Sequence, residues 1–379
     1  MIDIKITERN IAGVLQDPPS RAAKQLKRWG KAGMKRLLLI CWIAACAWPA
    51  WAQDKLVVDG IAPDRIVNMK VSLWLPPTHP LVPATKAWAD DIEKQSGGTI
   101  RMTIFPSEQL GKAFDHYDMA RDGIADVTYV SAGYQPGRFP IAADALLPFL
   151  IKDGRTGTLA VDEWYRKYAR TEMKDTYVCF AFLHDPGTLH SKKKIVLPSD
   201  LNGMKIRPAG STISDMVKMF GGTNVQTSAP EARDAIERGV ADAITFPWGS
   251  LILFGIDKAV KYHIDAPLYT ALFTYNINLD RYNALSPGQR QVIDDHCNQD
   301  WAARISSSWI DFETAGRVKL KADPGHEVYP LTAEQLGEWK KSLRPLHEAW
   351  AAAVRKSGGD PDAVDADLKA ALKKYQAGL

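Results

Sequence analysis

Alternating apolar and polar residues mark the first element that the sequence defines clearly. From Val67 to Leu75 every second residue is apolar, which is the period of a strand with one buried face. Pro76 and Pro77 end this strand because proline cannot donate a backbone hydrogen bond to a sheet. The pattern then changes period several times, and it predicts helices over 84–92 and 114–124 and strands over 100–104 and 127–130.

The second half of the chain repeats this succession. Residues 204–207 alternate and predict a strand that ends at Arg207, and 213–220 has the spacing of a helix. Ser228-Ala-Pro-Glu231 has the form of a capping box, which predicts a further helix before a strand over 241–246. Strands that alternate with helices are typical of α/β proteins, in which helices connect neighbouring strands.

A longer helical pattern begins at a second capping box, Ser286-Pro-Gly-Gln289. Apolar residues recur at helical spacing from there to Phe312, and neither glycine nor proline interrupts them before Gly316. A helix of about thirty residues is about 45 Å long, so we expect it to span two lobes. One more helix is predicted over 336–350, and a polar helix is predicted after Pro361.

The first 52 residues have the features of an export leader. Met34-Lys-Arg is followed by an apolar run from Leu37 to Trp48 and by Ala50-Trp51-Ala52, which together predict a secretory signal peptide over 34–52. The apolar run is shorter than the about 20 residues that span a bilayer. An amphipathic helix and a lipid anchor on Cys46 remain alternatives, and residues 1–33 precede any normal signal start.

Removing this leader changes the charge of the chain. The 379 residues carry 48 Lys and Arg against 44 Asp and Glu, and the first 52 hold nine of the former and three of the latter, so 39 basic and 41 acidic residues follow. The basic balance therefore gives no reason to expect a nucleic-acid partner. Two of the four cysteines, Cys179 and Cys297, lie outside the leader, and we expect them to be buried free thiols.

No catalytic or metal-binding motif is visible along the chain. The eight histidines form neither HExxH nor HxxxH, and CxxC, a phosphate-binding glycine loop and a Gly-x-Ser-x-Gly elbow are absent. His184-Asp185 has the residue types of part of a catalytic triad, but a histidine beside an aspartate at a strand end is more often structural. The sequence therefore favours a protein that is not an enzyme and needs no cofactor or metal.

Several stretches, in this order, resemble the solute receptors of tripartite ATP-independent periplasmic (TRAP) transporters. The resemblance extends from about residue 66 to 355, and its most informative part is Asp200-Leu-Asn-Gly-Met-Lys-Ile-Arg207. The other matching stretches are Phe105-Pro-Ser-Glu-Gln-Leu-Gly111, Asp122-Gly-Ile-Ala-Asp126, Leu147-Pro-Phe-Leu150, Gly221-Gly222, Glu231 and Ala235-Ile-Glu-Arg-Gly-Val-Ala-Asp242.

This resemblance implies a fold and a partner. The fold is an α/β, two-lobed periplasmic-binding-protein fold, with mixed sheets flanked by helices and a long lobe-spanning helix. The implied domains are lobe I over 65–186 with 272–312, lobe II over 187–271 with 313–355, and a C-terminal helix over 356–379. The implied setting is the periplasm, where the receptor delivers a small organic acid to membrane permease subunits without spanning the membrane itself.

Arg207 is the principal candidate for binding the ligand. In the family that the chain resembles, the arginine that ends this motif pairs with a substrate carboxylate. Arginine suits that role because its planar, permanently charged guanidinium donates two parallel hydrogen bonds to a carboxylate. The alternative is an ordinary surface ion pair.

The other candidate positions are more apolar than in relatives that bind acidic sugars. Such relatives often carry a second arginine two residues beyond a glycine, and Leu189 stands in that place after Gly187. The resemblance places aromatic rings at four further ligand-binding positions, and Tyr129 and Ser131 match a stretch that lines the cleft. The four aromatic residues are Trp74, Phe246, Trp248 and Phe273.

These features lead to a main hypothesis and two alternatives. The main hypothesis is a TRAP receptor for a monocarboxylate with an aromatic or otherwise apolar body. The first alternative is the same receptor for a small aliphatic keto or dicarboxylic acid, with the aromatic residues merely packing the cleft. The more distant alternative is an exported hydrolase.

Overall fold

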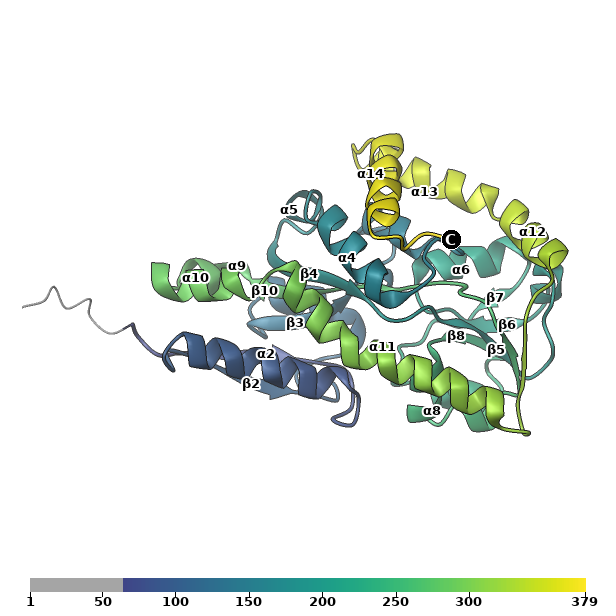
Figure 1. Cartoon of the computed structure of the whole chain (residues 1–379), viewed down its shortest axis with the longest axis horizontal. Coiled ribbons are helices and arrows are strands. Elements are labelled where there is room, and N and C mark those ends of the chain that lie inside the picture. The colour runs from purple at the N-terminus through teal and green to yellow at the C-terminus, as the bar shows by residue number, and fades with distance from the viewer. Residues whose placement is uncertain (1–63) are drawn as a thin grey trace, which may run out of the picture. The chain divides into compact units, whose positions relative to one another are not determined.

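The computed structural model describes residues 64–379, whose strands form two β-sheets (Figure 1). The predicted signal peptide, with Cys41 and Cys46, lies outside the described residues. Within 64–379, none of the helices has the length and apolar character that crossing a membrane requires. We call the elements around the five-stranded sheet the first lobe and those around the six-stranded sheet the second lobe.

The five-stranded sheet is mixed, as the fold class predicts. Its strand order is β2-β1-β3-β10-β4, in which β1 pairs in parallel with β2 and β3, while β10 runs antiparallel to β3 and β4. The strand bounds are Val67–Ser72 (β1), Ile100–Phe105 (β2), Val127–Ser131 (β3), Thr176–Leu183 (β4) and Leu272–Asn278 (β10).

The six-stranded sheet is also mixed. Its order is β11-β9-β5-β8-β6-β7, with β6 and β8 parallel and β5 antiparallel to both β8 and β9. The strand bounds are Thr188–Ser191 (β5), Lys205–Arg207 (β6), Thr223–Asn224 (β7), Ala243–Phe246 (β8), Tyr262–Ile264 (β9) and Glu327–Tyr329 (β11).

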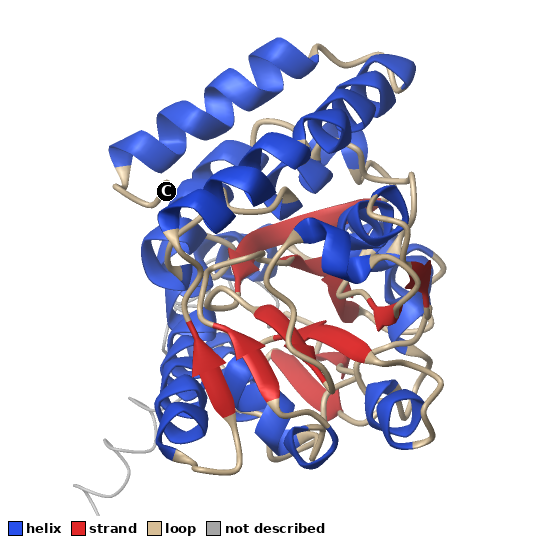
Figure 2. Ribbon diagram, turned by 90° about the vertical axis from the view of Figure 1, so that its right-hand side faces the viewer, coloured by secondary structure: helices blue, strands red, loops and turns tan. Residues whose placement is uncertain are grey.

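Helices cover both sheets (Figure 2). The α-helices of the first lobe and of the connections are α2 (Leu81–Gln95), α3 (His116–Arg121), α4 (Gly154–Tyr165), α5 (Ala169–Glu172), α9 (Leu279–Asn283), α10 (Pro287–Asp295) and α11 (Gln299–Ala322). Those of the second lobe and the C-terminal region are α6 (Ser211–Met219), α7 (Ala232–Glu237), α8 (Trp248–Leu253), α12 (Ala333–Ser342), α13 (Arg344–Lys356) and α14 (Pro361–Lys374). Short 3₁₀ helices are η4 (Ala113–Asp115), η5 (Ala132–Tyr134), η6 (Ala142–Leu146), η7 (Pro198–Leu201) and η8 (Asp257–Ala259).

The long helix that spans both lobes is present, but its predicted bounds are wrong. The capping box at Ser286 starts only the short helix α10, and Asn298 starts α11 by accepting a hydrogen bond from the backbone N–H of Trp301. The 24 residues of α11 contact α2 and α4 of the first lobe and α8 of the second (Figure 1). The apolar spacing is the same on both sides of the break, so periodicity alone does not reveal it.

Two other helix predictions also need correction. The pattern over 336–350 forms two helices, α12 and α13, which meet at Leu343. The helix expected directly after Ser228 begins only at Ala232, although the carboxylate of Glu231 does accept a hydrogen bond from the Ser228 backbone.

Gly316 does not interrupt α11, and its lack of a side chain lets α11 cross α8 closely. A methyl group on Gly316 would lie 2.3 Å from the Cα atom of Gly249 in α8, which is closer than any real contact. Glu313, one turn earlier, accepts hydrogen bonds from the backbone N–H groups of Gly249 and Ser250 at 2.5 and 3.0 Å. These contacts hold α11 against α8 of the second lobe.

Cys179 and Cys297 form a disulfide, so the prediction of free thiols is wrong. The two residues are 118 positions apart, and the bond joins β4 to the segment between α10 and α11. Sequence separation carries no information about this proximity, because only the folded sheet brings the two segments together. A disulfide agrees with an exported protein, since oxidising compartments are where such bonds persist.

The disulfide should contribute substantially to stability. In Cys179→Ala/Cys297→Ala we expect the free energy of unfolding to fall by about 2–4 kcal/mol, because the bond restricts a long loop in the unfolded chain. Urea unfolding under non-reducing conditions measures the difference. Alkylation of both thiols in the native, oxidised protein, detected by peptide mass mapping, would contradict the assignment.

Asp144 in η6 is a buried carboxyl without a protein partner. Its side chain is inaccessible to solvent, and neither carboxyl oxygen has a hydrogen-bond partner among residues 64–379. Burial raises the pKa of Asp144 to about 8, because the charged form loses its hydration there. The folded protein therefore holds this proton more tightly than the unfolded chain does.

This difference predicts a pH dependence of stability. The contribution of Asp144 is complete below about pH 4 and is lost as the pH rises towards about 8, because the unfolded chain releases the proton first. Asp144→Asn should therefore melt at progressively higher temperature than the wild type as the pH increases from 4 to 8. The exposed substitution Asp90→Asn is the control, and a difference that stays constant with pH would contradict the prediction.

Candidate functional site

The carboxyl ends of parallel strands from both sheets face one buried cavity between the lobes. In the first lobe, Trp74 lies two residues beyond β1, and Ser131 is the last residue of β3. In the second lobe, β6 ends at Arg207 and β8 ends at Phe246. This edge of a parallel sheet is where ligands bind in open α/β folds.

The cavity has a volume of about 40 Å³. That is room for little more than one or two water molecules, so the lobes are closed on one another. Its lining comprises Trp74, Leu75, His79, Ser131, Tyr134, His184, Arg207, Ala209, Ala229, Phe246, Pro247, Ser250, Phe254, Tyr269, Ala271, Phe273 and Trp309. Four sequence-predicted residues besides Arg207 are in this lining: Trp74, Ser131, Phe246 and Phe273.

Arg207 is almost completely buried, with 1 % of its surface exposed. Its Nε donates to the carbonyl of Thr227 at 3.0 Å, Nη1 donates to the carbonyl of Thr245 at 3.4 Å, and Nη2 donates to the hydroxyl of Tyr134 at 2.9 Å. The guanidinium also lies 5.4 Å from the centre of the Phe246 ring. The surface ion pair considered as an alternative is therefore excluded.

This buried charge has no protein counter-ion. Within the part of the chain that the structure describes, no carboxylate oxygen lies within 4.0 Å of the Arg207 nitrogens. A guanidinium has five N–H donors, and three are used here, so two remain for another group. A buried charge is costly unless an opposite charge pairs with it, which makes a carboxylate the matching ligand group.

Tyr134 joins the two lobes at this point. It belongs to η5 of the first lobe, and its hydroxyl binds Arg207 and also accepts a hydrogen bond from the backbone N–H of Ala229 at 2.9 Å. Beside it, Gly133 and Gly210 pack backbone to backbone, and a methyl group on Gly210 would lie 3.0 Å from the Cα atom of Gly133. These interlobe contacts close the cavity.

Aromatic rings form the first-lobe wall. Trp74 and Phe273 each stack on Tyr129, with a centroid separation of 4.9 Å in both pairs. Tyr129 is fully buried behind them and is not in the cavity lining. Its place in sequence predicted a contact with the ligand, whereas the structure puts it in the layer that supports Trp74 and Phe273.

Trp248 also lies behind the cavity lining. Its ring packs edge-on against His190 at 5.0 Å, on the side of the second sheet. His190 continues into a chain of hydrogen-bonded histidines through His263 to His326, with separations of 2.7 and 2.9 Å. Burial lowers the pKa of His190 and His263, so both rings are neutral packing groups.

Several lining residues were not predicted from the sequence. His79 follows the carboxyl end of β1, and Tyr134 follows that of β3. Their position after parallel strands could have identified both as residues that line the cavity. Tyr269 gave no such signal, because it lies between β9 and β10 and is brought to the cavity by its bridge to Gly187. Trp309 looked like part of the ordinary apolar face of α11.

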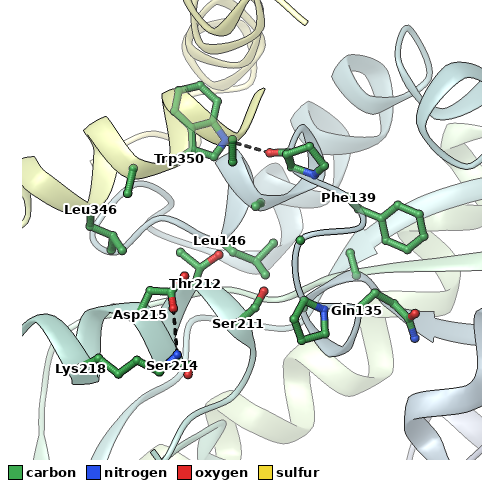
Figure 3. Close-up of a pocket in the computed structure, with 18 of the residues that line it drawn as sticks. Gln135, Phe139, Leu146, Ser211, Thr212, Ser214, Asp215, Lys218, Leu346 and Trp350 are labelled. Carbon is green, nitrogen blue, oxygen red and sulfur yellow. Dashed lines mark hydrogen bonds and ion pairs between the residues drawn. The ribbon is translucent and has the colours of Figure 1, made fainter. Parts of the chain in front are cut away.

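A second, larger cavity of about 390 Å³ is lined by residues that include Gly133 and Ser211 (Figure 3). Ser211, Thr212 and Lys218 from α6 face Leu346 and Trp350 across it. Lys218 already pairs with Asp215 at 3.3 Å, and the indole of Trp350 donates to the carbonyl of Pro140. Because the charges here are exposed and paired, we assign the ligand site to the smaller cavity at Arg207.

The fold and the site together define the class of the protein. Two α/β lobes that meet over a cavity characterise the periplasmic binding proteins. The family model described as "Bacterial extracellular solute-binding protein, family 7" matches residues 71–353, and the chain belongs to this family.

Solved structures agree with this assignment and confirm the TRAP type of receptor. A TRAP solute-binding protein from Rhodoferax ferrireducens, solved with benzoate, is 28 % identical, with a TM-score of 0.76 over 82 % of this chain and 98 % of that chain. One from Bordetella bronchiseptica, with bound (R)- and (S)-mandelate, is 28 % identical, with a TM-score of 0.75 over 81 % and 99 %. A marine metagenome receptor for aromatic acids, solved with 3-hydroxybenzoate, is 30 % identical, with a TM-score of 0.76 over 82 % and 99 %.

Proposed function

We propose that this receptor binds an organic monocarboxylate with an aromatic or otherwise apolar body and delivers it to TRAP permease subunits. The observation that carries the proposal is the buried guanidinium of Arg207, which has two unused N–H donors and no counter-ion within residues 64–379. A ligand carboxylate would accept both hydrogen bonds and neutralise the charge.

The remaining walls of the cavity favour an aromatic body. An arginine–carboxylate contact contributes about 1.5–3 kcal/mol, whereas micromolar binding requires about 8 kcal/mol. Burying a ring of about 150–250 Å² adds roughly 4–6 kcal/mol before ordering costs. Trp74, Phe246 and Phe273 supply surfaces for such a ring. The benzoate, mandelate and hydroxybenzoate complexes of the related receptors support the same ligand class.

A dicarboxylic acid fits the cavity less well. Arg207 is the one permanently charged residue in its lining, and Leu189 stands where a second arginine occurs in relatives that bind acidic sugars. A second carboxylate would therefore enter a buried, uncharged region at a large cost. A small aliphatic keto acid remains the alternative, and an exported hydrolase the more distant one, which turnover of an ester or amide would reveal.

Entry of the ligand requires the lobes to separate, because the closed cavity is too small for a ring. We infer that residues 65–186 with 272–312 move as one body and 187–271 with 313–355 as the other. The support for these bounds is that the chain passes from β4 to β5 and from β9 to β10 beside the bridge between Gly187 and Tyr269.

Export by the signal peptide at 34–52 and release into the periplasm belong to the same proposal.

Substitution of Arg207 tests the proposed function. In Arg207→Met we expect affinity for benzoate, measured by calorimetry, to fall about 10- to 150-fold, because the carboxylate loses a charge-assisted pair of hydrogen bonds. The melting temperature without ligand should be equal or higher, since an unpaired buried charge is removed. Arg207→Lys should bind with intermediate affinity, because lysine keeps the charge but lacks the planar fork.

Lys205→Met is the matched control, because Lys205 is exposed on the same strand and is not in the cavity lining. Unchanged benzoate affinity in Arg207→Met would overturn the assignment. Binding by the wild type of aliphatic keto or dicarboxylic acids alone would instead favour the alternative ligand class.

A further inference from the structure

Two buried histidines line the cavity and have no role in binding the carboxylate at Arg207. His79 lies in the loop after β1, and His184 directly follows β4. Both imidazoles pack against the indole of Trp309, at centroid distances of 5.1 and 5.4 Å. We call them the histidine pair, because both line the same cavity, both contact Trp309, and His184 adds to the effect of burial in lowering the pKa of His79.

The hydrogen bonds of His79 fix the position of its proton. Its Nδ1 accepts a hydrogen bond from the backbone N–H of Leu81 at 3.2 Å, so the proton lies on Nε2. Burial lowers the pKa of His79 to about 3, and the ring is neutral in any ordinary buffer. Nε2 is buried and has no partner among residues 64–379, so it is an unused donor.

His184 has the opposite arrangement. Its Nδ1 lies 2.5 Å from the carbonyl oxygen of Asp185, and because a carbonyl can only accept, Nδ1 carries the proton. Burial lowers the pKa of His184 to about 4, so its Nε2 is an unprotonated acceptor at neutral pH. The pair thus offers one neutral donor and one neutral acceptor within the same cavity.

We propose that His79 and His184 together bind a hydroxyl group on the body of the acid whose carboxylate pairs with Arg207. A hydroxyl accepts from Nε2–H of His79 and donates to Nε2 of His184, so both histidines are satisfied by one group. This inference rests on the proposed function and narrows its ligand class to hydroxy-substituted monocarboxylic acids.

Other polar groups fit the pair less well. A ketone oxygen can accept from His79 but leaves the acceptor of His184 unpaired, and an unpaired buried polar group weakens binding. A second carboxylate is also acceptor-only, and it would place its charge against the lone pair of His184. A bare ring would leave both histidines unpaired. The chemistry of the pair therefore selects an O–H group.

Matched acids that differ by one hydroxyl test this proposal on the full chain. The pairs are benzoate and 3-hydroxybenzoate, phenylacetate and mandelate, and propionate and lactate, with each affinity measured by calorimetry. We expect the wild type to prefer the hydroxylated member of at least one aromatic pair by about 10- to 100-fold. This comparison needs no variant and does not depend on the folding of one.

His79→Phe and His184→Phe remove the donor and the acceptor while keeping a ring beside Trp309. Each should abolish the preference by lowering affinity for the hydroxylated acid about 10- to 100-fold relative to the parent acid. His347→Gln, at an exposed histidine of α13, is the matched control and should preserve both affinities.

The possible outcomes separate this inference from the proposed function. Equal wild-type affinity within every pair, a preference that survives in both histidine variants, or an equal loss for both members of a pair would overturn the histidine assignment alone. If the protein bound lactate or propionate but none of the aromatic acids, the aromatic ligand class would be overturned. The comparison of lactate with propionate would then test the hydroxyl contact. Binding of none of the acids would overturn both.

Discussion

A permanent positive charge held out of water is the constraint on which the ligand site depends. The guanidinium of Arg207 is almost completely buried, and burial removes most of its hydration. Two backbone carbonyls and the hydroxyl of Tyr134 orient it, but their partial charges do not neutralise it. The same tyrosine binds the backbone of Ala229, so the contacts that position the charge also hold the lobes together. In the proposed site, ligand recognition and the contact between the lobes thus depend on the same few atoms.

The long helix α11 links the cavity wall to the second lobe. Glu313 of α11 accepts four hydrogen bonds, from the backbone and hydroxyl of Ser250, the backbone of Gly249 and the indole of Trp309. These bonds oppose the effect of burial, which raises the pKa of Glu313 to about 7. Trp309 also lines the cavity, so one side chain contacts both the cavity and the carboxylate that holds α11 to the second lobe.

Local sequence patterns predicted five of the eleven strands of the described residues, β1, β2, β3, β6 and β8, and the position of Arg207 at the end of β6, because both depend on neighbouring residues. The breaks at Asn298 and Leu343 were not predictable, since the apolar spacing continues across them and tertiary packing decides. The disulfide between Cys179 and Cys297 depends on contacts across 118 residues. Similarly, the sequence placed aromatic residues near the cleft but could not separate Trp74, which lines it, from Tyr129, which supports it. The proposed roles of His79 and His184 required knowledge of which ring nitrogen is already bonded.

The most direct measurement is a crystal structure of the protein with a bound aromatic acid such as mandelate. The proposed role of Arg207 predicts the two carboxylate oxygens within about 2.7–2.9 Å of its nitrogens, with the ring against the aromatic wall. The proposed role would be contradicted if the carboxylate bound elsewhere, for example beside Lys218 in the second cavity, and Arg207 still lacked a counter-ion.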